Sequence, residues 1–100
     1  NKIITDIESD KLQLNKKTLT SIFTGNVYLT RNQLAISANK IIVVQFKNKE
    51  NKTKIKYIEA YGNPATLTDV NEDGEHIKAV ASKIFYNQNT QRIKLIGNAK

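Results

Sequence analysis

Apolar and polar residues alternate along most of this chain, in short runs rich in Ile, Val, Thr, Tyr and Phe. Clusters of Asn, Lys, Gly and Asp separate the runs, and a sustained helical period is absent from the sequence. The pattern predicts strands at Asp6–Leu14, Leu19–Thr30, Leu34–Lys47, Lys54–Val70, His76–Tyr86 and Gln91–Lys100. Because the connections are short, consecutive strands are expected to pair as an antiparallel meander. The sequence therefore predicts an all-β fold with no significant helix.

Two short motifs recur along the chain, and such repeats indicate a repeated structural unit. Gly-Asn occurs at Gly25, Gly62 and Gly97, at intervals of 37 and 35 residues. The second motif is a small polar residue, a lysine and an aliphatic residue, as in Asp10-Lys11-Leu12, Asn39-Lys40-Ile41 and Ser82-Lys83-Ile84. The chain thus alternates two kinds of strand.

The alternation predicts which face of each strand points inward. Around the first Gly-Asn step, Phe23, Val27 and Leu29 share an apolar face, which is expected to be buried. In the lysine-containing strands the inward phase slips by one residue, for example between Ala38 and Ile41, and an extra residue of this kind predicts a β-bulge. Repeated corners would fold the sheet over an apolar trough. Beyond Pro64, a residue expected at an edge or a bulge, the phase is not defined by the pattern.

The motifs resemble the OstA family of lipopolysaccharide-transport proteins, to which LptA belongs. The most specific stretch is Ala60-Tyr61-Gly62-Asn63-Pro64-Ala65-Thr66, and Phe23–Thr30 and Leu95–Ala99 also match. Asn39 departs from the Ala-Asp-Lys that is usual at its position in the family. The resemblance covers nearly the whole chain in the right order.

The resemblance implies an antiparallel β-jellyroll or β-taco, a bent two-faced sheet that holds lipid A of lipopolysaccharide in an apolar groove. It implies a non-enzymatic, periplasmic protein in mature form without its signal peptide. It also implies head-to-tail homo-oligomers that bridge LptC-like inner-membrane and LptD-like outer-membrane jellyrolls. Residues 1–100 would form one such domain that lacks the family's C-terminal strands. The inward apolar positions expected to line the groove are Phe23, Val27, Leu29, Leu34, Ile36, Ile41, Val43, Ile58, Ile84, Tyr86 and Leu95.

Two other functions compete with this interpretation. The first is a related jellyroll of LptC or of the LptD amino terminus, against which the stretch Ala60–Ala65 argues. The second is a basic nucleic-acid-binding β domain, which a net charge of +7 would suit. Lysine dominates the cations of a chain that is also rich in Asn and Ile, so most of this charge is read as compositional. Because Phe23 and Tyr86 fall on the inward phase, they do not form a base-stacking platform, and no nucleic-acid partner is expected.

Catalytic and metal-binding chemistry find little support in the sequence. The chain has no cysteine, and its one histidine, His76, adjoins the polar turn Glu72–Glu75, whose spacing is not that of an EF-hand. We therefore expect no cofactor and no catalytic residue. The longest strongly apolar run, Ile41–Val44, is far shorter than the roughly 20 residues of a membrane span.

Overall fold

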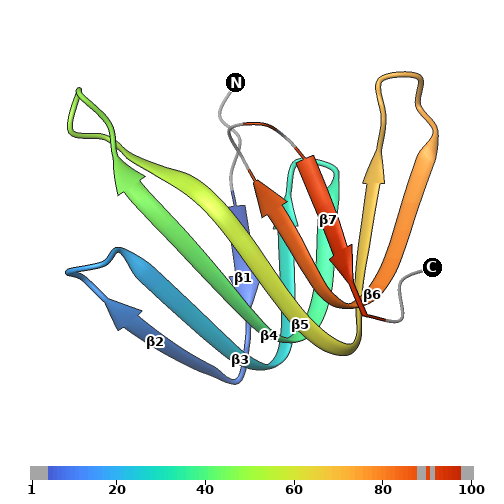
Figure 1. The fold of residues 1–100 in the computed structure, drawn as a ribbon, viewed down its shortest axis with the longest axis horizontal. Helices are drawn as coiled ribbons and strands as arrows, with labels where there is room; N and C mark the ends of the chain where they lie inside the picture. The colour runs from blue at the N-terminus through green and yellow to red at the C-terminus, as the bar shows by residue number, and fades with distance from the viewer. Residues whose placement is uncertain (1–4, 88–89, 91, 98–100) are drawn as a thin grey trace.

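The computed structural model describes residues 5–87, 90 and 92–97, and these form seven strands and no helix. All the strands join one antiparallel sheet in the order β1-β3-β4-β5-β6-β7, and β2 also pairs with β3 (Figure 1). The strands are β1 (Thr5–Glu8), β2 (Lys11–Asn15), β3 (Thr20–Arg31), β4 (Leu34–Lys47), β5 (Thr53–Val70), β6 (His76–Asn87) and β7 (Arg92–Ile96). The predicted all-β meander is confirmed.

The first predicted strand, Asp6–Leu14, is wrong as a single element. It divides at Ser9 and Asp10 into β1 and β2, and both pair with the long strand β3. The division lies where the sequence predicted a phase slip. Of the last predicted strand, Gln91 and residues 98–100 lie outside the described residues.

The long strands bend near their middles, so the sheet folds over into two layers that share those strands (Figure 1). Layer A consists of residues 11–15, 20–24, 40–47, 53–61, 83–87 and 92–96. Layer B consists of residues 5–8, 27–31, 34–38, 65–70 and 76–81. The line of bends between them is called the fold line below.

The two sequence motifs meet at the fold line. The Asp10 amide donates to the Gly25 carbonyl at 2.9 Å, and the Ser82 amide donates to the Gly97 carbonyl at 2.8 Å. At the middle step, the Asn63 amide donates to the Asn39 side chain at 3.2 Å. Each small polar residue that precedes a repeated lysine therefore contacts a Gly-Asn step, and the predicted corners line up.

The register places the extra residues on the Gly-Asn strands, which corrects the prediction of bulges in the lysine strands. Gly25 and Asn26 of β3 lie opposite the single residue Asn39 of β4. In β5, three residues including Pro64 lie opposite the single residue Ser82 of β6. The alternation of buried and exposed residues does shift by one along the lysine strands. The extra residue that accompanies this shift lies on the partner strand. Pro64 thus lies in a bulge, not at an edge.

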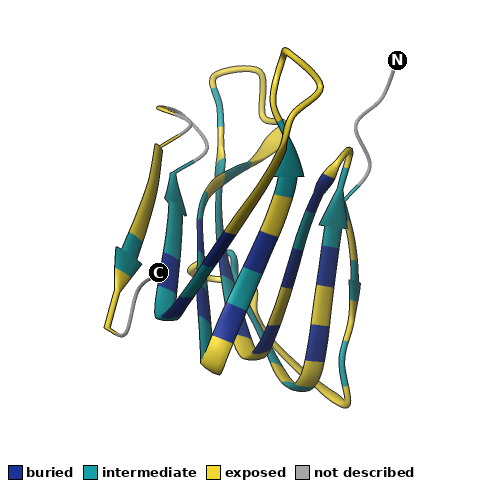
Figure 2. Ribbon diagram, turned by 90° about the vertical axis from the view of Figure 1, so that its right-hand side faces the viewer, coloured by how far each residue is buried: buried dark blue, intermediate teal, exposed yellow. Residues whose placement is uncertain are grey.

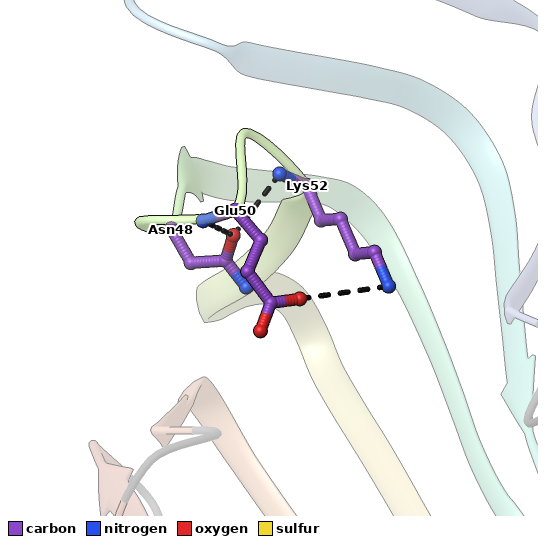
Figure 3. Close-up of polar contacts among 3 residues, drawn as sticks. All are labelled: Asn48, Glu50 and Lys52. Atoms are coloured by element: carbon purple, nitrogen blue, oxygen red, sulfur yellow. Dashed lines mark hydrogen bonds and ion pairs between the residues drawn. The ribbon is translucent and has the colours of Figure 1, made fainter.

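Asparagine side chains close the two long hairpins. In the turn between β4 and β5, Asn48 Oδ1 accepts hydrogen bonds from the amides of Glu50 at 2.9 Å and Lys52 at 3.0 Å (Figure 3). Asn71 does the same for Asp73 and Glu75 between β5 and β6. These contacts satisfy turn amides that have no strand partner, which explains the Asn-rich breaks in the sequence.

The core lies between the two layers. Ile36 and Leu67 of layer B and Ile41 and Ile58 of layer A are fully shielded from solvent and belong to one cluster. Buried positions fall on the long central strands, whereas the turns are exposed (Figure 2). The described residues include no buried polar or charged residue. The interior is therefore entirely apolar.

Candidate functional site

The predicted groove residues converge on one interior. Eight of them are buried members of a single cluster, namely Val27, Leu29, Leu34, Ile36, Ile41, Val43, Ile58 and Ile84. The other three, Phe23, Tyr86 and Leu95, are partly buried and pack against that cluster. The predicted inward phase is confirmed for all of these positions.

Strand pairing arranges the interior side chains in rows that cross the strands. One row of layer A runs through Phe23, Ile41, Ala60, Ile84 and Leu95, each paired with the next. The pairing in layer B gives the corresponding row Ile7, Leu29, Ile36, Leu67 and Ala79. Facing rows of this kind form one apolar interior that runs along the fold line and is called the trough below.

Sequence reasoning missed the contribution of the second half of β5. Ala65 and Leu67 are completely buried in the cluster. The Pro64 bulge broke the phase, so alternation from Ile58 could not be extended across it. The alternation of Ala65 and Leu67 with Thr66 and Thr68 is the signal that could have found them.

The interior rows do not stop at the buried core. Leu12 of edge strand β2 pairs with Phe23, and Leu14 pairs with Ser21 on the same inner face. At the other end, Ile93 of edge strand β7 pairs with Tyr86. Leu12, Leu14 and Ile93 are 51%, 64% and 41% exposed. The apolar trough therefore emerges into solvent at both ends of layer A.

Between its ends the trough is closed by its own side chains. Ile36, Ile41, Ile58 and Leu67 are fully shielded from solvent. Two pockets, of about 380 and 110 Å³, lie beside Leu14 at the β2 end. A long apolar ligand would have to enter from the exposed ends or separate the two layers.

A polar cluster on the outer face of layer A was not foreseen. The Tyr61 hydroxyl donates to Glu59 Oε2, and the Lys83 ammonium lies 3.6 Å from the same oxygen. The hydrogen bond to Glu59 and then partial burial raise the pKa of Tyr61. The hydrogen bond with Tyr61 raises the pKa of Lys83. Lys40 and Lys83 both lie over the Tyr61 ring, at 5.8 and 5.2 Å from its centroid.

Within the part of the chain that the structure describes, no three His, Asp or Glu side chains gather as metal ligands. His76 is exposed at the start of β6. The same described residues contain no helix that is long and apolar enough to cross a membrane. The chemistry that the fold does concentrate is apolar contact, in the trough between the layers.

The sequence is similar to known proteins. Residues 6–100 match the family described as "LptA/(LptD N-terminal domain) LPS transport protein". The chain is 32% identical over 93 residues to the lipopolysaccharide export system protein LptA of Escherichia coli K12, which covers 93% of this chain and 49% of that protein. It is 28% identical over 95 residues to LptA of Haemophilus influenzae, which covers 95% and 54%. The chain thus spans about half the length of these relatives.

The fold is also similar to a solved structure. The crystal structure of LptH from Pseudomonas aeruginosa, titled the LptA homologous periplasmic component of the lipopolysaccharide transport device, superposes with a TM-score of 0.85. The match covers 97% of this chain and 64% of LptH at 23% identity, so it establishes the jellyroll fold alone. Because the family match spans nearly the whole chain, this protein belongs to the LptA/LptD amino-terminal-domain family, whose members are lipopolysaccharide-transport components and not enzymes, as the sequence predicted.

Proposed function

We propose that this chain binds lipopolysaccharide through lipid A, whose acyl chains occupy the apolar trough between layers A and B. The observation that carries the proposal is the continuation of the interior rows to exposed apolar residues at both ends, Leu12 and Leu14 on β2 and Ile93 on β7. Singly exposed apolar residues are common, but residues that extend a buried row form a continuous apolar path. Such a path fits a long apolar ligand.

Apolar contact dominates the expected affinity. Transfer of an acyl chain of about a dozen methylenes from water is worth roughly 10 kcal/mol, at about 0.8 kcal/mol per methylene. An exposed lysine paired with a lipid phosphate adds about 0–1 kcal/mol. The trough residues therefore supply affinity, and the lysines steer and orient the phosphorylated head.

The closed centre of the trough suggests an order of contact. Leu12, Leu14 and Ile93 are accessible without any movement, whereas Ile36 and Ile58 are completely shielded. Lipid contact begins at the ends of the trough and reaches the deep residues as the layers part. The apolar side chains then contact the acyl chains in place of one another. Because the same apolar area stays buried, parting the layers costs little free energy.

The sheet edges support stacking of copies. At its two ends layer A terminates in β2 and β7, whose outer backbone groups have no strand partner among the described residues. An unpaired edge is a template for strand addition. We infer that copies stack head to tail in the periplasm, so that their troughs join. The same edges would bind LptC-like and LptD-like jellyrolls at the inner and outer membranes.

A matched pair of substitutions on β2 tests the lipid proposal. Leu12→Asp places a carboxylate on the inner face at an exposed position, and Gln13→Asp places the same charge on the adjacent outer face. Leu12→Asp should weaken lipopolysaccharide binding about tenfold or more, because burial of a leucine is worth about 1.5–3 kcal/mol. Gln13→Asp should leave binding near that of the parent. Equal effects of the two variants, or no loss with Leu12→Asp, would contradict the proposal.

A further inference from the structure

The outer face of layer A is apolar at its centre, although an exposed sheet face is ordinarily polar. Strand pairing places six large apolar side chains there, all partly buried: Ile22, Ile42, Val44, Phe46, Tyr57 and Phe85. The rings of Tyr57 and Phe85 stack with their centroids 5.1 Å apart. Layer A is thus apolar on both faces. Glu59 lies between Ile42 and Phe85, and the apolar patch continues past it through Val44 and Tyr57. An apolar patch of this kind on an outer face is typical of an interaction surface.

Cations surround this patch. The three repeated lysines, Lys11, Lys40 and Lys83, lie in one row along the fold line, with Thr24 and Tyr61 between them. Because neighbouring strands lie about 4.8 Å apart, successive lysines of the row start roughly 10 Å apart. The repeated lysine motif therefore lies at the bends and also places a row of ammonium groups on the outer face.

The charge is asymmetric between the two layers. Pairing assigns six cations to the outer face of layer A: Lys11, Lys40, Lys54, Lys83, Arg92 and Lys94. Glu59, the one carboxylate that the described pairing puts on that face, already has Lys83 as its partner. The outer face of layer B carries Asp6, Glu8 and Lys78. Much of the net positive charge is therefore gathered around the apolar patch.

An apolar patch surrounded by cations favours one class of partner over others. A second copy of the same face would bring the cations together, and their repulsion opposes such a dimer. Single-stranded nucleic acid stacks its bases on open aromatic faces, whereas Tyr57 and Phe85 stack on each other and are partly buried. A lipid surface with negative headgroups satisfies both features. The ammonium groups meet the headgroups, while the lysine stems and aromatic rings sit at the interface.

We propose that the outer face of layer A docks the protein peripherally on an anionic phospholipid bilayer. This contact uses side chains that point away from the trough, so it is separate from lipid A binding. A docked copy would hold its trough parallel to the membrane surface while the exposed ends of the trough stay free.

Co-sedimentation of the full chain with lipopolysaccharide-free vesicles tests the proposal. The protein should bind vesicles of phosphatidylcholine with phosphatidylglycerol, lose binding as salt is raised, and not bind vesicles of phosphatidylcholine alone. Lys54→Gln with Lys94→Gln should weaken binding about 25-fold, at about fivefold per cation. The control is Lys78→Gln on the outer face of layer B together with Lys16→Gln in the turn between β2 and β3. It removes the same charge from outside the paired face and should weaken binding less than about fivefold.

Phe46→Ser tests the apolar part of the same surface. The variant keeps every charge and should still bind less well than the parent, provided that circular dichroism shows an unchanged fold. Four results would overturn the proposal: no binding to the anionic vesicles, equal binding to neutral vesicles, equal losses in the two double variants, or tighter binding to a single-stranded oligonucleotide. Because the vesicles contain no lipopolysaccharide, failure here is distinct from failure of the trough proposal.

Discussion

Replacement of Gly25 by alanine tests the fold line. Gly25 has φ +86°, and a Cβ added there would lie 2.6 Å from Asp10 Oδ2 and 3.0 Å from Asp10 Cβ. The backbone strain costs about 1–3 kcal/mol. Overpacking against Asp10 adds about another 1–3 kcal/mol, since Asp10 also accepts a hydrogen bond from Asn26 at 3.2 Å and cannot move freely. Gly25→Ala should therefore lower the free energy of unfolding by about 2–6 kcal/mol in urea titrations.

Gly74 supplies the matched control. Its φ is +81°, nearly that of Gly25, but an added Cβ would meet nothing within 4 Å. Gly74→Ala therefore measures the backbone cost alone, and Gly25→Ala should exceed it by at least about 1 kcal/mol. Asp10→Gly should partly rescue Gly25→Ala, because it removes the contacting side chain. A Gly25→Ala variant as stable as Gly74→Ala would refute the close approach of the two motifs.

Four further predictions concern stability. Ile36→Ala should cost about 2–5 kcal/mol in urea unfolding. Leu14→Ala, at a position 64% exposed, should stay within about 0.5 kcal/mol of the parent. Asn48→Ala leaves two turn amides without their acceptor and should lower the urea midpoint by the equivalent of about 1 kcal/mol. Because the pKa of Tyr61 is raised, the folded protein binds the hydroxyl proton more tightly than the unfolded chain does. The stability that this proton contributes is present below about pH 10 and is lost as the pH rises further. Tyr61→Phe, which removes the hydrogen bond to Glu59, should lose less stability between about pH 8 and about pH 11 than the parent does; an equal loss would contradict this assignment.

Strand positions and the buried face could be predicted because both depend on local alternation. Leu34–Lys47 was placed with its observed bounds, and Ile36, Ile41 and Ile58 are buried as predicted. Alternation of apolar and polar residues reports which side of a strand faces the core without any knowledge of its partner. The repeated corners predicted the folded-over shape, and the family resemblance implied the jellyroll.

The location of the bulges could not be predicted, because a bulge is a property of two paired strands. The slip between Ala38 and Ile41 is visible in one strand, but only the register shows that the extra residue belongs to Gly25-Asn26 on the partner. The same limit applies to the polar cluster. Glu59 and Lys83 are distant in the sequence and meet only through the pairing of β5 with β6.

The apolar outer face of layer A did leave a signal in the sequence. The run Ile41–Val44 is continuously apolar, and such a run is typical of a strand covered on both sides. The run is too short for a membrane span, and burial on both faces of β4 accounts for its apolar character. The role of the trough residues in lipid binding stays a prediction.

Site-specific photo-crosslinking to lipopolysaccharide tests the central claim most directly. A photoreactive side chain would replace, one at a time, the inward residues Leu14, Phe23 and Ile93 and three outward residues of layer B, Tyr28, Ser37 and Val80. The three inward positions span the trough from β2 to β7. We predict that lipopolysaccharide is captured from all three inward positions and from none of the outward ones. Capture that is equal on the two faces, or confined to the outward face, would contradict lipid binding in the trough.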